Sequence, residues 1–294
     1  MEVNAVATAQ AQSWRAIYLN APTIPFWGVH VLAIVGIAIT GFSLTGVLVA
    51  LACYVPRMWF VTGAYHRYFS HRTYKTSRWF QFVLALGAQC TGEKGALWWA
   101  AHHRVHHRLS DQPGDIHSVV QSGFWWSHMG WFLARDLEAV DYSRIKDFTK
   151  YPELVWLDKL WMVPPVVMGV LAFALGGFWG LIWAFALPQI MCWHGTFTIN
   201  SLSHLWGSRR YNTGDDSRNN PVLAVITLGE GWHNNHHHYQ VSARNGFFWW
   251  EYDVTFYVLN VMSAVGLVLD LHLVPDHIRA DIAAESDDSS AIAA

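Results

Sequence analysis

The chain has 294 residues and a formal net charge of −2; 53% of its residues are hydrophobic and only 14% are charged. Soluble domains contain about a quarter charged residues and nucleic-acid-binding domains are usually basic, so the composition favours a membrane protein and argues against nucleic acid as a partner. The 18 Trp residues also favour a membrane protein, because Trp is enriched at membrane–water interfaces. The three cysteines are isolated in or near apolar runs, and we interpret them as core residues, not as disulfide partners.

The first long apolar segment covers residues 25–65, with Arg57 as its only charge. A single helix of that length would be about twice as long as the hydrocarbon core of a bilayer is thick. The interruption at residues 40–43 therefore predicts a transmembrane hairpin, with arms at about 26–40 and 44–65.

The second long apolar segment covers residues 160–199 and contains no charged residue. Two consecutive glycines, Gly176 and Gly177, interrupt it. The same length argument predicts a second transmembrane hairpin, with arms at about 161–175 and 178–199.

Polar segments connect and follow the hairpins. Residues 66–159 and 200–280 carry most of the charges and are expected to form a cap. Within it, 254–269 is an apolar helix that is long enough to span the membrane but is expected to cover the core or lie at the membrane interface. Residues 1–24 begin without the basic and apolar pattern of a secretory signal and are expected to be cytoplasmic. Residues 281–294 are mostly Ala, Ser and acids and are expected to be a disordered tail.

The basic residues indicate how the chain is oriented. Of 19 Lys and Arg, twelve lie within 66–159, five follow residue 204, and the hairpin tips contain none. The positive-inside rule then places both polar regions and both termini on the cytoplasmic side. The sequence therefore predicts an all-α integral membrane protein with four transmembrane helices in two hairpins and a helical cytoplasmic cap.

All three histidine clusters fall in that cap or at its border. His103, His106 and His107 lie at i, i+3 and i+4, and His233, His236 and His237 repeat this spacing, which brings three imidazoles to one helix face. The upstream cluster supplies His66 and His71, and Asn200 and His204 lie at i, i+4 at the end of an apolar arm. We expect His102 to support the site from outside and His238 not to be a ligand. The isolated histidines are expected to be structural: His30, His128, His194, His272 and His277.

Nine histidines are too many for one metal ion, which takes about four to six ligands, and they fit two ions. Imidazole suits Fe, Zn, Cu or Ni, and the absence of H-E-x-x-H argues against a zincin protease. Two irons at the membrane face of such a protein suggest O₂ activation on an apolar substrate. Ligating histidines need hydrogen-bond acceptors behind them; the candidate acids are Glu93, Asp111, Asp115, Asp215, Asp216 and Glu230.

From about residue 66 to 271 the chain resembles the membrane fatty acid desaturases of the stearoyl-CoA (Δ9) type. Four ordered motifs carry the resemblance: H-R-Y-F-S-H, H-R-V-H-H-R, N-S-L-S-H-L-W-G and G-E-G-W-H-N-N-H-H. The linking Asp115-Ile116-His117 also matches a family motif, without a clear role. The resemblance implies a di-iron centre with mostly histidine ligands in the cap. It also implies O₂-dependent insertion of a cis double bond, expected at Δ9, into a saturated C16–C18 chain carried as acyl-CoA.

The resemblance also divides the ligands between two irons. It assigns to one iron His66, His71, His107 and His237, with Asn200 reaching it through water. It assigns to the other iron His103, His106, His204, His233 and His236. Zn could replace Fe in purified material, because imidazole binds both.

An apolar tunnel would hold the acyl chain. By resemblance, Trp99 and Thr196 form its bend, and Met58 and Tyr54, eight and twelve residues before His66, are expected near its closed end. Five basic side chains are available for the head group at the mouth: Arg67, Arg72, Lys75, Arg104 and Arg108.

The chain departs from the family in two respects. It contains no His-Pro-Gly-Gly segment of a cytochrome b5-like domain, so we expect a separate electron donor, a ferredoxin or a b5-type protein with its reductase. Its polar loops are short, which leaves CoA, acyl carrier protein or a glycerolipid open as the head group.

Two other functions are alternatives to this one. A di-iron membrane hydroxylase or alkane monooxygenase would share the histidine motifs and differ in its product. A histidine-rich metal transporter would need ligands and acids within its spans, but residues 160–199 contain one His and no acid.

Overall fold

The computed structural model describes residues 2–281, so the tail expected at 281–294 lies almost wholly outside the described residues. The first hairpin consists of α3 (Ile24–Thr40) and α4 (Leu44–Trp59), which continues as the π-helical segment η2 (Phe60–Ser70). The turn lies within the expected interruption: Gly41 has a φ of 75°, and the Ser43 side chain caps α4 by accepting a hydrogen bond from the Gly46 N–H. Because η2 extends α4, it carries His66 into the cap.

The second apolar segment also turns back on itself. α11 (Val163–Gly180) is interrupted at Gly177, whose φ of 59° and ψ of −153° are not helical, and η6 (Leu181–Ala186) and α12 (Leu187–Ser201) return. Gly180 lies so close to the Ala172 carbonyl that a Cβ there would be 2.5 Å from its oxygen. By length and composition, the described residues contain three stretches able to cross a membrane: Ala21–Thr40, Leu44–Ser70 and Val163–His204. The fourth predicted span therefore depends on the break at Gly177.

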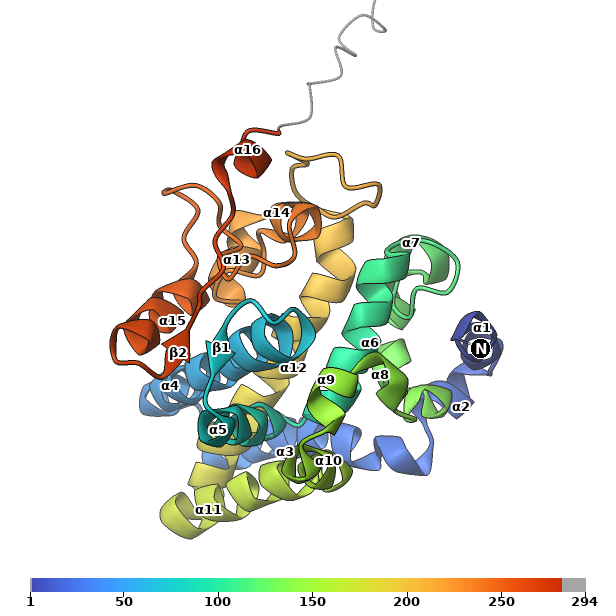
Figure 1. Ribbon diagram of the computed structural model, residues 1–294. Coiled ribbons are helices and arrows are strands. Elements are labelled where there is room, and N and C mark those ends of the chain that lie inside the picture. The colour runs from blue at the N-terminus through green and yellow to red at the C-terminus, as the bar shows by residue number, and fades with distance from the viewer. Residues whose placement is uncertain (1, 282–294) are drawn as a thin grey trace, which may run out of the picture.

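Shorter elements form the cap around the ends of η2 and α12 (Figure 1). Their bounds are α1 (Glu2–Gln10), α2 (Trp14–Tyr18), η1 (Ala21–Thr23), β1 (Lys75–Thr76), α5 (Arg78–Gln89), α6 (Ala96–Leu109), α7 (Val119–Ser122), η3 (Trp126–Gly130), α8 (Trp131–Leu133), η4 (Arg135–Leu137), η5 (Tyr142–Arg144), α9 (Lys146–Thr149), α10 (Pro152–Lys159), η7 (Leu202–His204), α13 (Pro221–Ile226), α14 (His233–His238), α15 (Val254–Ala264), β2 (Val268–Leu269) and α16 (Asp276–Arg279).

Two expectations about the C-terminal region require correction. The apolar helix expected at 254–269 ends at Ala264, because Gly266 adopts a φ of 75° and the chain then enters β2. β2 pairs antiparallel with β1, with Lys75 opposite Leu269, so the cap is not purely helical.

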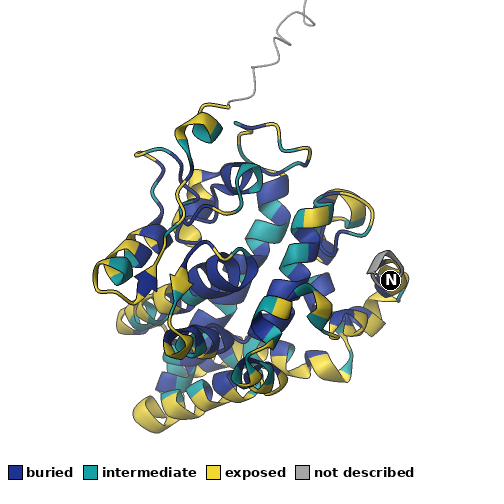
Figure 2. Ribbon diagram, viewed as in Figure 1, coloured by how far each residue is buried: buried dark blue, intermediate teal, exposed yellow. Residues whose placement is uncertain are grey.

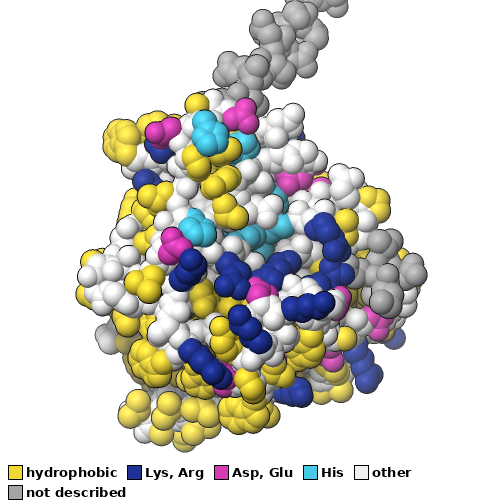
Figure 3. Space-filling view, viewed as in Figure 1, with side chains coloured by type: hydrophobic (Ala, Val, Ile, Leu, Met, Phe, Trp, Pro, Cys, Tyr) yellow, Lys and Arg dark blue, Asp and Glu magenta, His cyan; other side chains and the backbone are white. Residues whose placement is uncertain are grey.

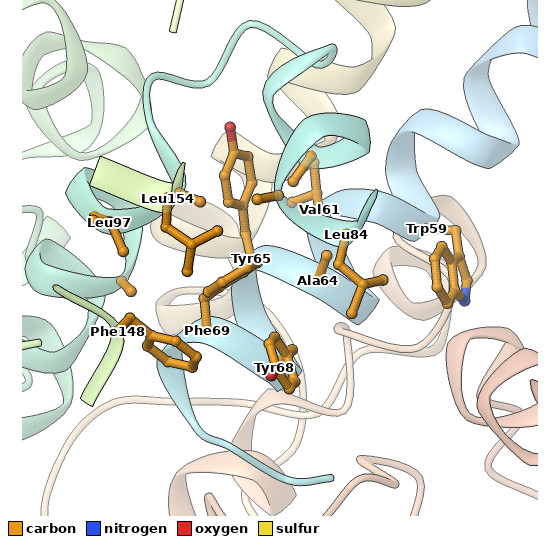
Figure 4. Close-up of a cluster of buried hydrophobic side chains, with 14 of the residues drawn as sticks. Trp59, Val61, Ala64, Tyr65, Tyr68, Phe69, Leu84, Leu97, Phe148 and Leu154 are labelled. Carbon is orange, nitrogen blue, oxygen red and sulfur yellow. The ribbon is translucent and has the colours of Figure 1, made fainter. Parts of the chain in front are cut away.

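Burial separates the two halves of the molecule. The outer faces of α3, α4 and α11 are exposed and apolar; Figure 2 shows much of α11 in the exposed colour, and Figure 3 shows hydrophobic side chains over it. Buried side chains concentrate where η2, α5 and α6 meet; Tyr65, Phe69, Leu84 and Leu97 pack together there (Figure 4). This core fixes η2 against α6, the two elements that carry the first two histidine clusters.

Three of the isolated histidines form one hydrogen-bonded row. His30 on α3 faces the Phe26 carbonyl with Nδ1 at 2.8 Å, and its Nε2 lies 3.1 Å from His194 Nε2. His194 Nδ1 lies 2.9 Å from His128 Nε2 on η3. The row connects α3, α12 and the cap, which fits the structural role expected for them.

Candidate metal centre

Five histidines from three distant segments form group A. His66 comes from η2 and His71 follows it, His103 and His107 come from α6, and His236 comes from α14; one ring nitrogen of each lies within 4.8 Å of the others. Nε2–Nε2 distances of 2.9–3.0 Å connect His66, His236, His107, His103 and His71 in that order.

Four histidines form group B. His106 comes from α6, His204 from η7, and His233 and His237 from α14, again with ring nitrogens within 4.8 Å of one another. The Nε2 atoms of His204 and His233 are 3.1 Å apart. Asn200, one turn before His204, lines the same chamber as His106 and His233.

These groups differ from the division implied by the resemblance: His103 and His236 lie in group A, and His237 lies in group B. The reason is helix geometry, since residues four apart differ by about 40° in direction and residues three apart by about 60°. The ring centroids of His103 and His107 are accordingly 4.6 Å apart, whereas those of His103 and His106 are 5.9 Å apart. On α14 the corresponding distances from His233 are 4.4 Å to His237 and 6.0 Å to His236.

Carboxylates lie behind four of the nine imidazoles. The Nδ1–oxygen distances are 2.8 Å for His66–Glu230, 3.0 Å for His106–Asp115, 2.8 Å for His204–Asp111 and 2.6 Å for His237–Asp215. Three of these contacts are hydrogen bonds, those of His106, His204 and His237, and each places the proton on Nδ1 and leaves the Nε2 lone pair directed into its group. Of the other two candidate acids, Asp216 pairs with Arg209, and Glu93 forms no hydrogen bond or ion pair with a histidine among the described residues.

The positions of the imidazole nitrogens suit metal coordination better than hydrogen bonding between the rings. With Nδ1 protonated, the Nε2 atom of His204 can only accept, so His233 would have to donate to it from Nε2 at 3.1 Å, which leaves the buried His233 Nδ1 without a hydrogen-bond partner. The Nε2 atoms of His106 and His237 are buried and have no hydrogen-bond partner. Two nitrogens at right angles, each about 2.1 Å from a shared ion, would lie about 3.0 Å apart, whereas a tetrahedral ion would separate them by about 3.4 Å. Group A therefore has the spacing of an ion with right-angled ligands.

Burial also keeps the imidazoles available to a metal at neutral pH. It lowers the pKa of His71, His103, His107 and His236 well below the usual value, and the neighbouring imidazoles lower it further. In group B, burial lowers the pKa of His237 to about 4 against the opposing effect of Asp215. The exception is His106: burial lowers its pKa, but Asp115 outweighs burial and raises it. Neutral imidazole is the form that binds metal.

A narrow chamber adjoins both groups. Met58, Trp99 and Thr196 line it together with His66, His103, His106 and His233, so three of the four expected tunnel residues meet the metal centre. Tyr54 lies beyond it: its hydroxyl donates to the Ile226 carbonyl beside Gly195, the residue before Thr196. The chamber has about 30 Å³, enough for one or two waters, so an acyl chain enters only if lining side chains move.

Glu93 was expected behind the metal and instead lies at the expected bend. Its carboxyl accepts hydrogen bonds from Thr196 Oγ1 at 2.7 Å and from Trp99 Nε1 at 3.3 Å. Its side chain is 1% exposed, and burial raises its pKa to about 8 although both hydrogen bonds oppose this. At neutral pH the carboxyl is therefore protonated, and it holds Trp99 and Thr196 together as a neutral group.

This protonation predicts a pH-dependent stability. Between about pH 4.5 and 8 the folded state keeps a proton that the unfolded chain has lost, so the free energy of unfolding falls as pH rises and levels off above the folded-state pKa. Glu93→Gln supplies the same neutral contacts and removes this dependence. Denaturant unfolding in detergent at several pH values checks it: the variant should gain stability relative to the parent as pH rises towards about 8. A constant difference between the two proteins would contradict a protonated Glu93.

The cap contains a buried ion network that the sequence did not reveal. Arg67, expected at the mouth, is 1% exposed; it donates to Glu230 Oε1 at 2.9 Å and pairs with Asp253 at 2.9 Å. Asn245 donates to the other oxygen of Glu230. The network connects η2, α15 and the segment before α14, and thereby positions the carboxylate behind His66. Arg67 is not available to a head group; Arg104 is held by Asp147, while Arg72, Lys75 and Arg108 are exposed.

His117 joins the centre, although no role was evident for it from the sequence. It lines the chamber, its ring lies 4.1 Å from that of His106, and its buried Nδ1 has no hydrogen-bond partner. The sequence signals were the Asp115-Ile116-His117 motif and the position of His117 two residues after Asp115, the carboxylate behind His106. His102 and His238 lie in neither group: His102 faces the Trp98 carbonyl, and His238 stacks on Tyr211.

Comparison with known proteins bears on this centre. A family model described as fatty acid desaturase matches residues 42–259. The chain is 35% identical over 253 residues to an sn-1 stearoyl-lipid 9-desaturase of Anabaena variabilis, covering 85% of this chain and 93% of that protein. It is 33% identical to a palmitoyl-monogalactosyldiacylglycerol delta-7 desaturase of Arabidopsis thaliana, covering 94% of this chain and 74% of that protein. It is 36% identical to an icosanoyl-CoA 5-desaturase of Limnanthes douglasii, covering 72% of this chain and 61% of that protein.

Proposed function

Because the chain belongs to the fatty acid desaturase family, we propose that it introduces a cis double bond at Δ9 into saturated C16–C18 acyl chains in an O₂-dependent reaction. The observation that carries this proposal is that both histidine groups adjoin one chamber with Met58, Trp99 and Thr196. In the reaction, two vicinal hydrogens leave the chain. O₂ takes them up with two electrons and two protons, and two waters form.

The ten proposed ligands would hold two iron ions. Group A would bind one iron through His66, His71, His103, His107 and His236. Group B would bind the other through His106, His204, His233 and His237, with Asn200 acting through water. Iron supplies the one-electron chemistry that reduces O₂. The contribution of the carboxylates is to keep the Nδ1 protons in place and the Nε2 lone pairs directed inwards.

The chamber residues position a chain that offers no polar group near the reacting carbons. Trp99 stacks on Tyr65 at 5.5 Å and on His103 at 4.7 Å, so its indole forms a rigid wall beside group A. Glu93 fixes Trp99 to Thr196 across the chamber. A chain held against this wall keeps one pair of methylenes next to the metals, which is the positioning that a regiospecific reaction requires.

We propose that the acyl chain is carried by a glycerolipid, in place of the CoA thioester that the resemblance implied. Two lipid 9-desaturases are matched over 93% of their length, and the burial of Arg67 removes one basic group from the expected mouth. Electrons come from a separate ferredoxin or a b5-type protein with its reductase. The cap and both termini face the cytoplasm, because most of the Lys and Arg residues lie in the cap segments and the positive-inside rule places such segments on the cytoplasmic side.

Expression in a desaturase-deficient host tests the function. Double-bond mapping should show Δ9 monounsaturated C16 and C18 chains, and separation of lipid classes should show them in glycerolipids before the acyl-CoA pool. A variant lacking His106 is the inactive control, with iron and zinc content measured in the same preparations. Hydroxylated chains would indicate a hydroxylase of the same metal type, and product without iron would contradict the proposal.

Met58 provides a test of chain-length selection. Its side chain is fully buried, and its Cε lies only 2.6 Å from where a Gly195 Cβ would be, so it fills the space beside the chamber. Met58→Ala is expected to shift the products towards longer chains, measured as the C16 to C18 product ratio. Val55→Ala on the exposed face of α4 is the matched control. An unchanged ratio in Met58→Ala would show that Met58 does not limit the tunnel.

A further inference from the structure

A second, larger cavity lies away from the metal centre. It is a groove of about 700 Å³ between α3 and α11, with its floor on η6 and α12. Val29 and Leu32 form one wall, Val166 and Val170 form the other, and Phe185 and Trp193 lie on the floor. Because these walls belong to the stretches able to cross a membrane, the medium that meets the groove is the acyl region of the bilayer.

One end of the groove is charged. Lys94, whose side chain is 13% exposed, reaches that end, and its ammonium lies near the rings of Trp161 (5.0 Å), Phe132 (5.4 Å) and Trp98 (5.8 Å). The nearest carboxylate, Glu138, is 3.8 Å away, too far for a hydrogen bond. Among the described residues the ammonium has no hydrogen-bonded acceptor, although it carries three donors.

Lys94 occupies this position although both its backbone conformation and the burial of its charge are unfavourable. Its φ of 70° is a left-handed conformation that residues other than glycine rarely adopt. Its carbonyl accepts a hydrogen bond from Tyr65, 2.6 Å away, which fixes the backbone. Burial lowers the pKa of Lys94, and Glu138 only partly opposes this, so an anion close to Nζ would stabilise the charge.

We propose that the groove is a binding site for one anionic phospholipid of the surrounding membrane, with an acyl chain between α3 and α11 and its phosphate on Lys94. An apolar groove with one incompletely paired ammonium at its end matches an amphiphile that has one anionic head and a long chain. A zwitterionic phospholipid fits less well because its own cation competes for the phosphate. On the floor, the buried Gln189 Oε1 lacks a partner, and a head-group hydroxyl can donate to it.

Native mass spectrometry of the full-length protein tests the site. The protein is released from detergent with equimolar phosphatidylglycerol and phosphatidylcholine of identical acyl chains. We expect one retained phosphatidylglycerol, favoured about fivefold over phosphatidylcholine. Equal retention of the two lipids would mean an ordinary lipid annulus and would overturn the proposal.

Four variants separate the head-group contact from the groove. Lys94→Asn, with a residue that tolerates positive φ, should abolish the preference, whereas Glu138→Gln removes the competing exposed carboxylate and should increase it. Val166→Trp fills the groove and should lower retention of both lipids. Val167→Trp, on the adjacent exposed position that does not line the groove, should leave retention unchanged. A preference that survives Lys94→Asn, or equal effects of the two tryptophans, would contradict the site.

Discussion

The His107→Ala/His236→Ala double variant is expected to lose desaturation activity by more than about 100-fold and to keep about one of two metal ions per chain. Both residues lie in group A, where their Nε2 atoms are 2.9 Å apart. Removing both damages one ion site and leaves the four histidines of group B complete. Mutating a residue that only hydrogen-bonds to a metal ligand typically lowers metal affinity or activity by about 10–100-fold. Here two ligands themselves are removed, so activity should be lost.

The neighbouring double variant, His107→Ala/His237→Ala, provides the matched comparison. It removes one ligand from each group, so both ions should bind weakly and the retained metal should fall below about one ion per chain. Metal content by mass spectrometry, together with double-bond formation in the expression host, distinguishes the two variants. His238→Phe, which keeps the stack on Tyr211, should retain both ions. The reverse pattern, with more metal in His107→Ala/His237→Ala, would restore the division implied by the resemblance.

Arg67→Met is expected to destabilise the fold by about 3–5 kcal/mol. Its guanidinium is 1% exposed and lies between the carboxylates of Glu230 and Asp253, which are both almost fully buried. Removing the guanidinium leaves two buried carboxylates without their cation. Breaking a buried ion pair is costly mainly because the remaining charge stays buried and uncompensated. The effect should extend to the metal centre, because Glu230 also contacts His66 Nδ1.

Arg72→Met is the matched control for this prediction. Arg72 forms an ion pair of similar length with Asp147, 2.9 Å, but its side chain is 50% exposed, and exposed pairs contribute about 0–1 kcal/mol. Denaturant unfolding in detergent compares the two free energies, and metal content is measured in parallel. Equal destabilisation by the two substitutions would show that the buried network does not hold η2 in the cap.

Much of the architecture follows from local sequence properties. The two apolar segments are too long for one crossing, and the structure turns each near the expected glycine, Gly41 and Gly177, because backbone at positive φ ends a helix. The histidine clusters were recognisable because i, i+3 and i+4 spacing is a property of a single helix. His106 and His107, adjacent in sequence, do face different groups as expected, and so do His236 and His237.

What the sequence by itself determined is therefore which residues are available and on which local face they lie. Tertiary structure alone decided which histidines from different segments share a group, because α6, η2 and α14 meet at angles that no spacing within one of them specifies. It also decided which charges are buried: Arg67 and Glu93 look like other surface residues until α15 and α12 cover them. Helical periodicity is a short-range property. Which histidines share a group, and which charges are buried, depend on how distant segments pack, and this packing assembles the centre.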